Sequence, residues 1–408
     1  FYFEPCTGVN SVKNDTNMYI RPLSALLCLV FCLSLSLGYA QKPQKILGIA
    51  KENKPVSYYE EQSTLWCELL ENDKKNAEAW HYYYKAQRSI LQLQEDGPWP
   101  NDKESFYGQL AKILDRAQPH IDNTFEYHYL RGLNTEGADA IKALQQAYAI
   151  DPDRPEVYGW LFTHHIPRFD GQICRELAEK MLASDSYSNA NLKWNYNALH
   201  TVETGGIFIA NGDMDAIPKW VLQYGAQIRP DVLVISKWFM ASDKNYREKI
   251  CEQIGIAVPG RTAEAFGSTT EYADYLVVQL LQNGKRSAYI SSGTPREFFR
   301  NVGLADQMYL VGNALKYAAQ PFDNTAVLRE NVEEKYYLEH LELNFQHHSE
   351  DEMVHTQMHL TYLPCLAHLR KFYQETGQAT KEAHYDRLIQ RIAAASGREK
   401  EVLSWFAD

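Results

Sequence analysis

The chain has 408 residues, of which 45% are hydrophobic and 23% are charged, and its formal net charge is -11. The length suggests two or three globular domains, and the apolar fraction is sufficient for a buried core. The negative charge argues against nucleic acid or an anionic membrane surface as a partner.

The N-terminal region has the pattern of a secretory signal peptide. Arg21 precedes an apolar run over residues 23–37, and small residues stand three and one before a cut after Ala40. The run is shorter than the ~20 residues of a membrane-spanning helix, which is typical of a cleaved leader. We expect residues 18–40 to be removed, residues 1–17 to be spurious upstream translation, and the protein to be exported to the periplasm or cell envelope. A retained N-terminal anchor is the alternative, and no later segment is apolar enough to span a membrane.

Four cysteines follow the predicted leader, and no two of them have a C-x-x-C spacing. This pattern indicates neither a zinc ribbon nor a disulfide scaffold. We expect single buried thiols, with one long-range disulfide as the alternative in an oxidising compartment. The four residues are Cys67, Cys174, Cys251 and Cys365.

Residues 41–200 show a helical pattern with features of degenerate tetratricopeptide-like repeats. Trp80 stands where the first helix of such a repeat has its aromatic residue. In the second helix, small residues allow paired helices to pack closely and a proline ends the unit. The small, large, small and terminating positions of that helix are occupied by Ala140, Leu144, Ala147 and Pro152. Stacked helix pairs of this kind commonly bind a protein or peptide partner, and a purely structural helical cap is the alternative.

Residues 201–325 alternate short apolar runs with helical stretches. The runs are "GGIFIA", "PDVLVIS", "KRSAYISS" and "QMYLVGNALKY". This alternation predicts βαβ units and a small, mostly parallel, Rossmann-like sheet, so the predicted fold class is α/β plus all-α. The helices expected between the strands are Ala216 to Gln227, Lys244 to Ile254 and Thr270 to Gln282.

Residues 326–408 return to a helical pattern. We expect helices over residues 326–343, 354–376 and 381–395, with Gly377 as the break between the last two. Helical hairpins are therefore predicted to flank the α/β domain on both sides in the chain.

An acidic loop follows the first predicted strand. Asn211-Gly212 is a turn dipeptide, and Asp213 and Asp215 precede a helix that contains Pro218. Ligands of open α/β sheets bind beyond the carboxyl ends of strands, so these carboxylates are candidates for holding Mg²⁺, Ca²⁺ or sugar hydroxyls. The alternative is structural, because Asp215 is well placed as the helix N-cap. Asp213, which capping does not explain, is the better functional candidate.

The same segment resembles a known family. The stretch "GDMDAIPKWVLQYGAQIRPDVLVIS" is similar to the soluble C-terminal domain of bacterial membrane proteins of unknown function that resemble protein O-mannosyltransferases. The residues at matching positions are Gly212, Asp213, Asp215, Pro218, Trp220, Gln223, Arg229, Asp231 and Val232. The resemblance covers about half of the chain after the leader and implies an exported version of an accessory domain. It does not imply glycosyl transfer, because the membrane portion that carries the catalytic residues of such transferases is missing.

The chain departs from the family pattern beside the second aspartate. Met214 and Ala216 replace a polar Asn and Thr, which removes two potential ligands. Arg229 and Asp231 complete the candidate ligand-binding set with Asp213 and Asp215, and a structural ion pair at the next strand's edge is their alternative role. The sequence predicts no cofactor and no metal site.

A second group of polar residues lies near the C-terminus. His355 and His359 are four residues apart, on one helix face, and His347 and His348 lie just upstream. Two imidazoles at this spacing can chelate zinc, but Thr356 replaces the glutamate that follows the first histidine of metalloproteases. We interpret this face as a solvated polar surface.

Two functions of different classes follow. The first is an exported binding or scaffold protein whose helices hold a protein or peptide and whose α/β domain is a structural or ligand-recognising module, with an envelope glycan as a candidate partner. The second is a cell-envelope hydrolase or transferase that acts on glycans through Asp213 and Asp215. The first is favoured because no Ser-His-Asp or Cys-His signature is recognisable in the sequence.

Overall fold

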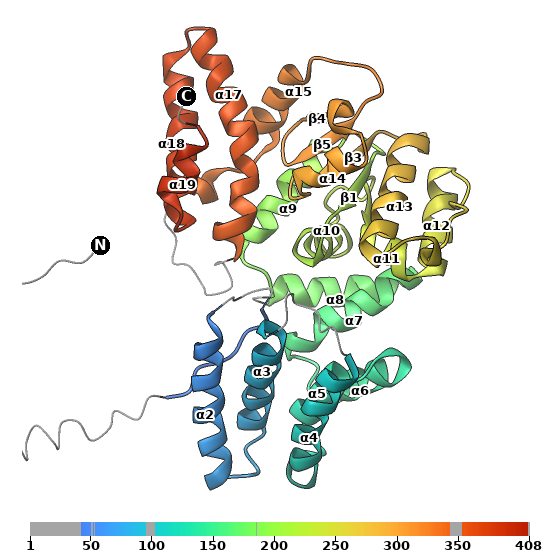
Figure 1. Ribbon diagram of the computed structural model, residues 1–408, viewed down its shortest axis with the longest axis vertical. Coiled ribbons are helices and arrows are strands. Elements are labelled where there is room, and N and C mark those ends of the chain that lie inside the picture. The colour runs from blue at the N-terminus through green and yellow to red at the C-terminus, as the bar shows by residue number, and fades with distance from the viewer. Residues whose placement is uncertain are drawn as a thin grey trace, which may run out of the picture. The chain divides into compact units, whose positions relative to one another are not determined.

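The chain is mostly helical, with one small sheet (Figure 1). Contacts group Lys45–Asp408 as one compact unit. The predicted leader over residues 18–40 and the segment before it lie outside the described residues. The computed structural model describes residues 42–49, 52, 54–94, 103–184, 186–342 and 353–406.

The first part of the described chain consists of helices that pair along the sequence. Helix α2 packs against α3, α5 against α6, and α7 against α8, in agreement with the predicted helical pairs. The bounds are α2 (Val56–Asn72), α3 (Ala77–Leu93), α4 (Lys103–Ile121), α5 (Phe125–Leu133), α6 (Gly137–Ile150), α7 (Tyr158–His165), α8 (Gly171–Ala183) and α9 (Asn189–Thr201).

Local sequence explains how these helices start and approach each other. The Asn76 side chain caps α3 by accepting the N–H of Ala79 at 2.9 Å, which satisfies one otherwise free donor of the first turn. Trp80 of α3 is buried. Gly132 allows α5 to approach α6, because a Cβ at this position would lie 2.6 Å from Cγ of Leu144.

The sheet has five strands in the order β2-β1-β3-β5-β4. Strand β1 pairs in parallel with β2 and with β3, whereas β5 pairs antiparallel with both β3 and β4. Ile207 of β1 lies opposite Leu233 of β2 and Ala288 of β3. The bounds are β1 (Ile207–Ala210), β2 (Leu233–Ser236), β3 (Ala288–Ser291), β4 (Met308–Leu310) and β5 (Ala314–Tyr317).

Helices predicted between the strands form close to their expected positions. Helix α12 has the predicted bounds, α13 extends one residue further at each end, and α10 begins three residues early. The bounds are α10 (Asp213–Ala226), α11 (Lys237–Ser242), α12 (Lys244–Ile254), α13 (Thr269–Asn283) and α14 (Arg296–Asn301).

Both faces of the sheet are covered by helices (Figure 1). Successive side chains of a strand point to opposite faces. Phe208 and Ala210 of β1 pack in a large core with residues of α8, α9 and α10. Ile207 and Ile209 pack in a second core with residues of α12 and α13. Burial on both faces explains why β1 is a continuous apolar run.

The expectation of a mostly parallel sheet is wrong for its last two strands. The run "QMYLVGNALKY" is a hairpin, in which β4 and β5 are joined by Val311, Gly312 and Asn313. A parallel connection needs a dozen or more residues, so this short turn enforces antiparallel pairing. Gly312 has φ +138°, a conformation that favours glycine and permits the reversal. The sheet is therefore mixed.

The C-terminal part contains helical hairpins, with interruptions that the sequence did not predict. Gly377, at φ +71°, separates α17 from α18 as expected. The helix predicted over residues 326–343 breaks, because α9 holds the intervening segment: Asn197 Oδ1 accepts the N–H of Tyr337 at 2.9 Å. The bounds are α15 (Asn324–Glu330) with a π-helical continuation (Asn331–Lys335), α16 (Glu339–Glu342), a π-helical turn (Val354–Met358), a 3₁₀ turn (His359–Tyr362), α17 (Leu363–Glu375), α18 (Ala379–Ala395) and α19 (Glu399–Ser404).

The predicted domain boundaries coincide with changes between elements. The boundary near residue 200 falls at the end of α9, and the boundary near residue 325 falls at the start of α15. As boundaries between separate domains they stay predictions. In the part of the chain that is described, no helix combines the length and the apolar character needed to cross a membrane.

Candidate functional site

The acidic loop lies at the carboxyl end of β1, as the sequence predicted. Because β2 and β3 flank β1 on opposite sides, strand order reverses here, which is the usual ligand position in an open sheet. Asn211 connects the neighbouring turns: its Nδ2 donates to the Gly293 carbonyl at 3.4 Å, and its carbonyl accepts from Trp238 Nε1 at 2.9 Å. The hydroxyls of Ser292 and Thr294, in the turn after β3, are buried without a hydrogen-bond partner among the described residues.

Asp215 is not the helix N-cap that the sequence suggested. Helix α10 begins at Asp213 with Gly212 at the cap position, so Asp215 lies within the first turn. One carboxylate oxygen of Asp215 accepts the N–H of Asn211 at 2.8 Å, and the other forms an ion pair with Lys219 at 2.5 Å. Asp215 is only 8% exposed. Both carboxylate oxygens are therefore engaged inside the protein.

Lys219 is a fully buried lysine that the sequence analysis missed. Its Nζ donates to Asn195 Oδ1 of α9 at 2.8 Å and to the Asp215 carbonyl at 2.9 Å, in addition to the ion pair. The ammonium also lies over the rings of Trp194 and Phe208, 4.6 and 4.3 Å from their centroids. Burial lowers the pKa of Lys219, while the Asp215 carboxylate opposes that shift. The Asp215–Lys219 pair thus ties α9, α10 and β1 together.

Asp213, unlike Asp215, is neither buried nor paired with a described residue. It is exposed, and its carboxylate makes no hydrogen bond or ion pair with any described residue. Surrounding protein atoms partly desolvate it and raise the pKa of this carboxyl group. Of the two predicted carboxylates, Asp213 is the one free to meet a ligand.

Arg229 and Asp231 form the structural ion pair that was the alternative to ligand binding. The guanidinium donates to both carboxylate oxygens of Asp231, at 2.9 and 2.8 Å. It also donates to the carbonyls of Leu199 and Val202, at 3.0 and 2.9 Å, and Asp231 accepts the N–H of Gly205 at 3.1 Å. These hydrogen bonds from Arg229 lower the pKa of Asp231 to about 2. The pair fastens the end of α9 to the start of β2.

Two further residues of the quoted motif close the outer edge of β2. Among the described strands, β2 has no neighbour on that side, so its outward carbonyls need other partners. Trp220 Nε1 donates to the Val234 carbonyl at 3.2 Å, and Gln223 Nε2 donates to the Val232 carbonyl at 2.7 Å. Much of the motif therefore serves to hold α10 against β2.

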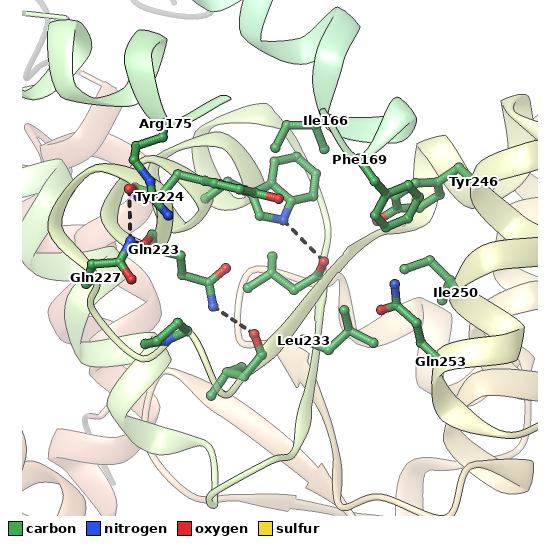
Figure 2. A pocket seen from close by; sticks show the side chains of 14 residues that line it. Ile166, Phe169, Arg175, Gln223, Tyr224, Gln227, Leu233, Tyr246, Ile250 and Gln253 are labelled. Atoms are coloured by element: carbon green, nitrogen blue, oxygen red, sulfur yellow. Dashed lines mark hydrogen bonds between the residues drawn. The ribbon is translucent and has the colours of Figure 1, made fainter. Parts of the chain in front are cut away.

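A cavity of about 320 Å³ lies beside this closed edge. Its lining comes from the turn before α8, from α8, α10, β2 and α12, and from the connection between α10 and β2, and Figure 2 shows the side chains around it. Its volume is within the range of small-molecule sites, roughly 300–1,000 Å³. Four aromatic rings contribute to the apolar wall: Phe169 from the turn before α8, Trp220 and Tyr224 from α10, and Tyr246 from α12.

The polar groups of the cavity are only partly engaged. Gln227 Nε2 donates to the carbonyls of Gln223 and Tyr224, at 3.2 and 3.1 Å, which leaves its Oε1 as an acceptor. The side chains of Arg175 and Gln253 make no hydrogen bond with a described residue, and both are exposed. Arg175 and Gln227 lie on one side of the cavity, and Gln253 lies on the other (Figure 2).

Strained backbone is concentrated at this cavity. Among the described residues, the non-glycine residues with positive φ are Phe169 at 60°, Gln227 at 57° and Arg229 at 47°. Phe169 and Gln227 line the cavity, and the Arg229 carbonyl accepts a 2.8 Å hydrogen bond from Gln223 of the same wall. Each such conformation costs on the order of 1 kcal/mol, and at Phe169 and Gln227 it forms the left-handed C-cap that ends the preceding helix.

The histidine pair is not the solvated polar face that we expected. His355 and His359 are buried, at 9% and 2% exposure, with ring centroids 4.8 Å apart. His340 joins them, 5.1 Å from His359, and burial lowers the pKa of His340 to about 4. His347 and His348 lie outside the described residues. Within the described ranges, no three His, Cys, Asp or Glu side chains are arranged to hold a metal ion.

The cysteines agree with the expectation of single thiols. Cys174, Cys251 and Cys365 are buried and Cys67 is partly buried, and all four are free. Burial raises the pKa of Cys365 to about 12, which keeps this thiol protonated. The long-range disulfide kept as an alternative is not formed among them.

Comparison with known proteins leaves the family open. No protein-family model matches the chain, and no curated protein matches it. The resemblance to the soluble domain of O-mannosyltransferase-like membrane proteins therefore rests on the quoted residues alone.

Sequence reasoning missed the cavity and the buried lysine for different reasons. The Asp215–Lys219 pair has the i,i+4 spacing of a helical ion pair, which was a usable signal. Arg175, Tyr224 and Gln253 come from three different helices, so no local pattern links them.

Proposed function

We propose that this protein is an exported binding protein of the periplasm or cell envelope that holds a small envelope glycan in the cavity beside β2. The observation that carries this proposal is the cavity lining, in which aromatic rings meet unengaged amide and guanidinium groups. A sugar ring presents apolar C–H faces and hydroxyl groups together, so this lining matches its chemistry.

The paired N-terminal helices support a second part of the proposal, in which tetratricopeptide-like repeats bind a protein or peptide. A hollow of about 220 Å³ lies between α3 and α4. Its lining combines apolar contacts with amide and ammonium groups, which suits a peptide chain. The lining includes Tyr83, Leu91, Gln109, Lys112 and Ile113.

The finer fold assignment is part of this proposal. Three parallel strands in the order β2-β1-β3, with helices on both faces, support a Rossmann-like description of the sheet domain. The motif shared with the soluble domain of O-mannosyltransferase-like proteins supplies Trp220 and Gln223 to the cavity. We infer that this protein is an exported relative of that accessory domain.

A glycan hydrolase or transferase is the second candidate, and one observation favours keeping it. Asp213, with a raised pKa, lies at the same sheet edge as the unpartnered hydroxyls of Ser292 and Thr294. An enzyme that uses both Asp213 and Asp215 has less support, because Asp215 is paired with Lys219. Asp213 would then act alone as an acid or base.

Calorimetric titration of the full chain with neutral and carboxylated envelope disaccharides tests the cavity. We expect binding by the unaltered protein, a loss of roughly 2- to 10-fold in Gln253→Ala from a lost hydrogen bond, and a larger loss in Tyr224→Ala. Asp213→Asn is the matched control at the strand ends and should bind as the parent does. The reverse pattern, with binding lost only in Asp213→Asn, would move the site to the strand ends and favour the enzyme. Export is supported if the periplasmic chain begins at Gln41, and contradicted if the leader is retained in the cytosol.

A further inference from the structure

The charge of the cavity lining is opposite to that of the whole chain. Arg175 is the only charged side chain among the lining residues, although the chain carries a formal net charge of -11. Two arginines outside the lining are engaged within the protein: Arg229 pairs with Asp231, and Arg247 donates to the Met240 carbonyl at 2.6 Å. The Arg175 side chain makes no hydrogen bond or ion pair with a described residue, so its guanidinium is available as a planar, two-pronged donor, which is the geometry that a carboxylate accepts.

The groups around Arg175 fit a saccharide. Tyr224 lies beside it, partly buried, and offers a ring to an apolar sugar face (Figure 2). Gln227 offers a free Oε1, and the Gln253 amide offers both a donor and an acceptor from the opposite side. Sugar hydroxyls donate and accept, so they can use both kinds of group.

The same edge disfavours an extended peptide as the occupant. A peptide that extends a sheet needs the free backbone groups of an edge strand. Here Gln223 and Trp220 occupy the Val232 and Val234 carbonyls, and the N–H of Ser236 donates to Tyr246 Oη at 3.3 Å. Side chains have taken the positions that a peptide backbone would use.

We propose that the cavity takes a carboxylated saccharide, and this inference rests on the glycan-binding function proposed above. Arg175 binds the sugar carboxylate through paired N–H donors. Tyr224 contacts an apolar face of the ring, and Gln227 and Gln253 bind its hydroxyls. Arg175 thereby determines the preference for an acidic over a neutral sugar.

Titration with a matched pair of disaccharides tests this assignment. Cellobiouronic acid and cellobiose differ at one carbon, which is a carboxylate in the first and a hydroxymethyl group in the second. We expect the full chain to bind the acid at least about 10-fold more tightly, as a charge-assisted hydrogen bond implies. Arg175→Gln should bind both sugars equally. Lys180→Gln, which removes a charge from the same helix outside the cavity lining, should keep the preference.

The outcomes separate this inference from the proposed function. Equal affinity of the unaltered protein for both sugars, or equal weakening of both by Arg175→Gln, would overturn the role of Arg175. If the unaltered protein binds both sugars with equal affinity and Gln253→Ala weakens both, the cavity is a glycan site without acid selectivity. If neither sugar binds, both the inference and the glycan function fail.

Discussion

Asp213 and Asp215 lie two positions apart in the first turn of α10, yet one is exposed and the other is buried. An α-helix turns about 100° per residue, so side chains two positions apart point to nearly opposite sides. Asp215 faces the protein interior, where a carboxylate must be paired, and Lys219 on the next turn provides the charge. Asp213 faces outward and needs no partner. Helical geometry alone therefore divides an apparent pair of acids into a structural residue and an available one.

Replacing Asp215 tests this division. Asp215→Asn keeps an oxygen for the Asn211 N–H but leaves the buried ammonium of Lys219 without its counter-charge. Breaking one side of a buried ion pair costs about 3–5 kcal/mol, whereas an N-cap Asp→Asn exchange would be nearly neutral. We expect urea unfolding to show that Asp215→Asn lowers the unfolding free energy by the amount expected for a broken buried ion pair. An unchanged unfolding free energy would restore the capping interpretation.

Two further variants identify the cause of that loss. Lys219→Met removes the cation, so the double variant Asp215→Asn with Lys219→Met should lose less stability than the sum of the single changes. The exposed Lys244–Glu248 pair, with the same i,i+4 spacing, is the matched control. Glu248→Gln should change the unfolding free energy by roughly 0.5 kcal/mol or less.

Among the elements, prediction succeeded where the local sequence decides the structure. Asp243 caps α12 by accepting the N–H of Tyr246, and Gly255 adopts φ +72° after it, so both ends of this helix can be read from the chain. Prediction failed where distant residues decide. Tyr337 is held out of a helix by Asn197 of α9, and the Lys219 ammonium that pairs with Asp215 is held by Asn195 of the same helix. The cavity belongs to this second class.

The β4–β5 turn provides a test at the scale of one element. A Cβ at position 312 would lie 2.0 Å from Oη of Tyr336, and φ is +138° there. Gly312→Ala should therefore cost about 2 kcal/mol or more in unfolding free energy, from backbone strain together with the clash. Gly303→Ala is the matched control, because φ is +70° and no atom lies within 4 Å of its added Cβ.

Removing the clashing hydroxyl separates the two contributions. Tyr336→Phe deletes Oη, so Gly312→Ala combined with Tyr336→Phe should lose less stability than the sum of the two single changes. Gly303→Ala should cost only about 1–2 kcal/mol, since it meets strain without a clash. Equal losses in Gly312→Ala and Gly303→Ala would contradict the steric argument. Chemical denaturation of the four variants provides the measurement.

For the molecule as a whole, one hydrophobic core contains residues from all three predicted domains, 41–200, 201–325 and 326–408. Trp66 of α2, Phe208 of β1 and Val402 of α19 belong to the same cluster of buried side chains. The helices before and after the α/β segment therefore complete its core on one face of the sheet. Asn195 and Trp194 of α9 also supply part of the environment of buried Lys219 in α10. The α/β segment thus depends on its helical neighbours for both apolar and polar contacts.

This shared core predicts cooperative unfolding of Lys45–Asp408. We expect scanning calorimetry of the full chain to show a single transition, because no part can lose its packing without exposing the face of another. An excised fragment over residues 201–325 should show no cooperative transition, since it lacks α9 and leaves Lys219 with fewer partners. A fragment over residues 187–408, which restores α9 and the C-terminal helices, is the matched control and should recover a transition at reduced temperature. Two separate transitions in the full chain, or a cooperative transition in the 201–325 fragment, would mean that the α/β segment folds independently of its neighbours.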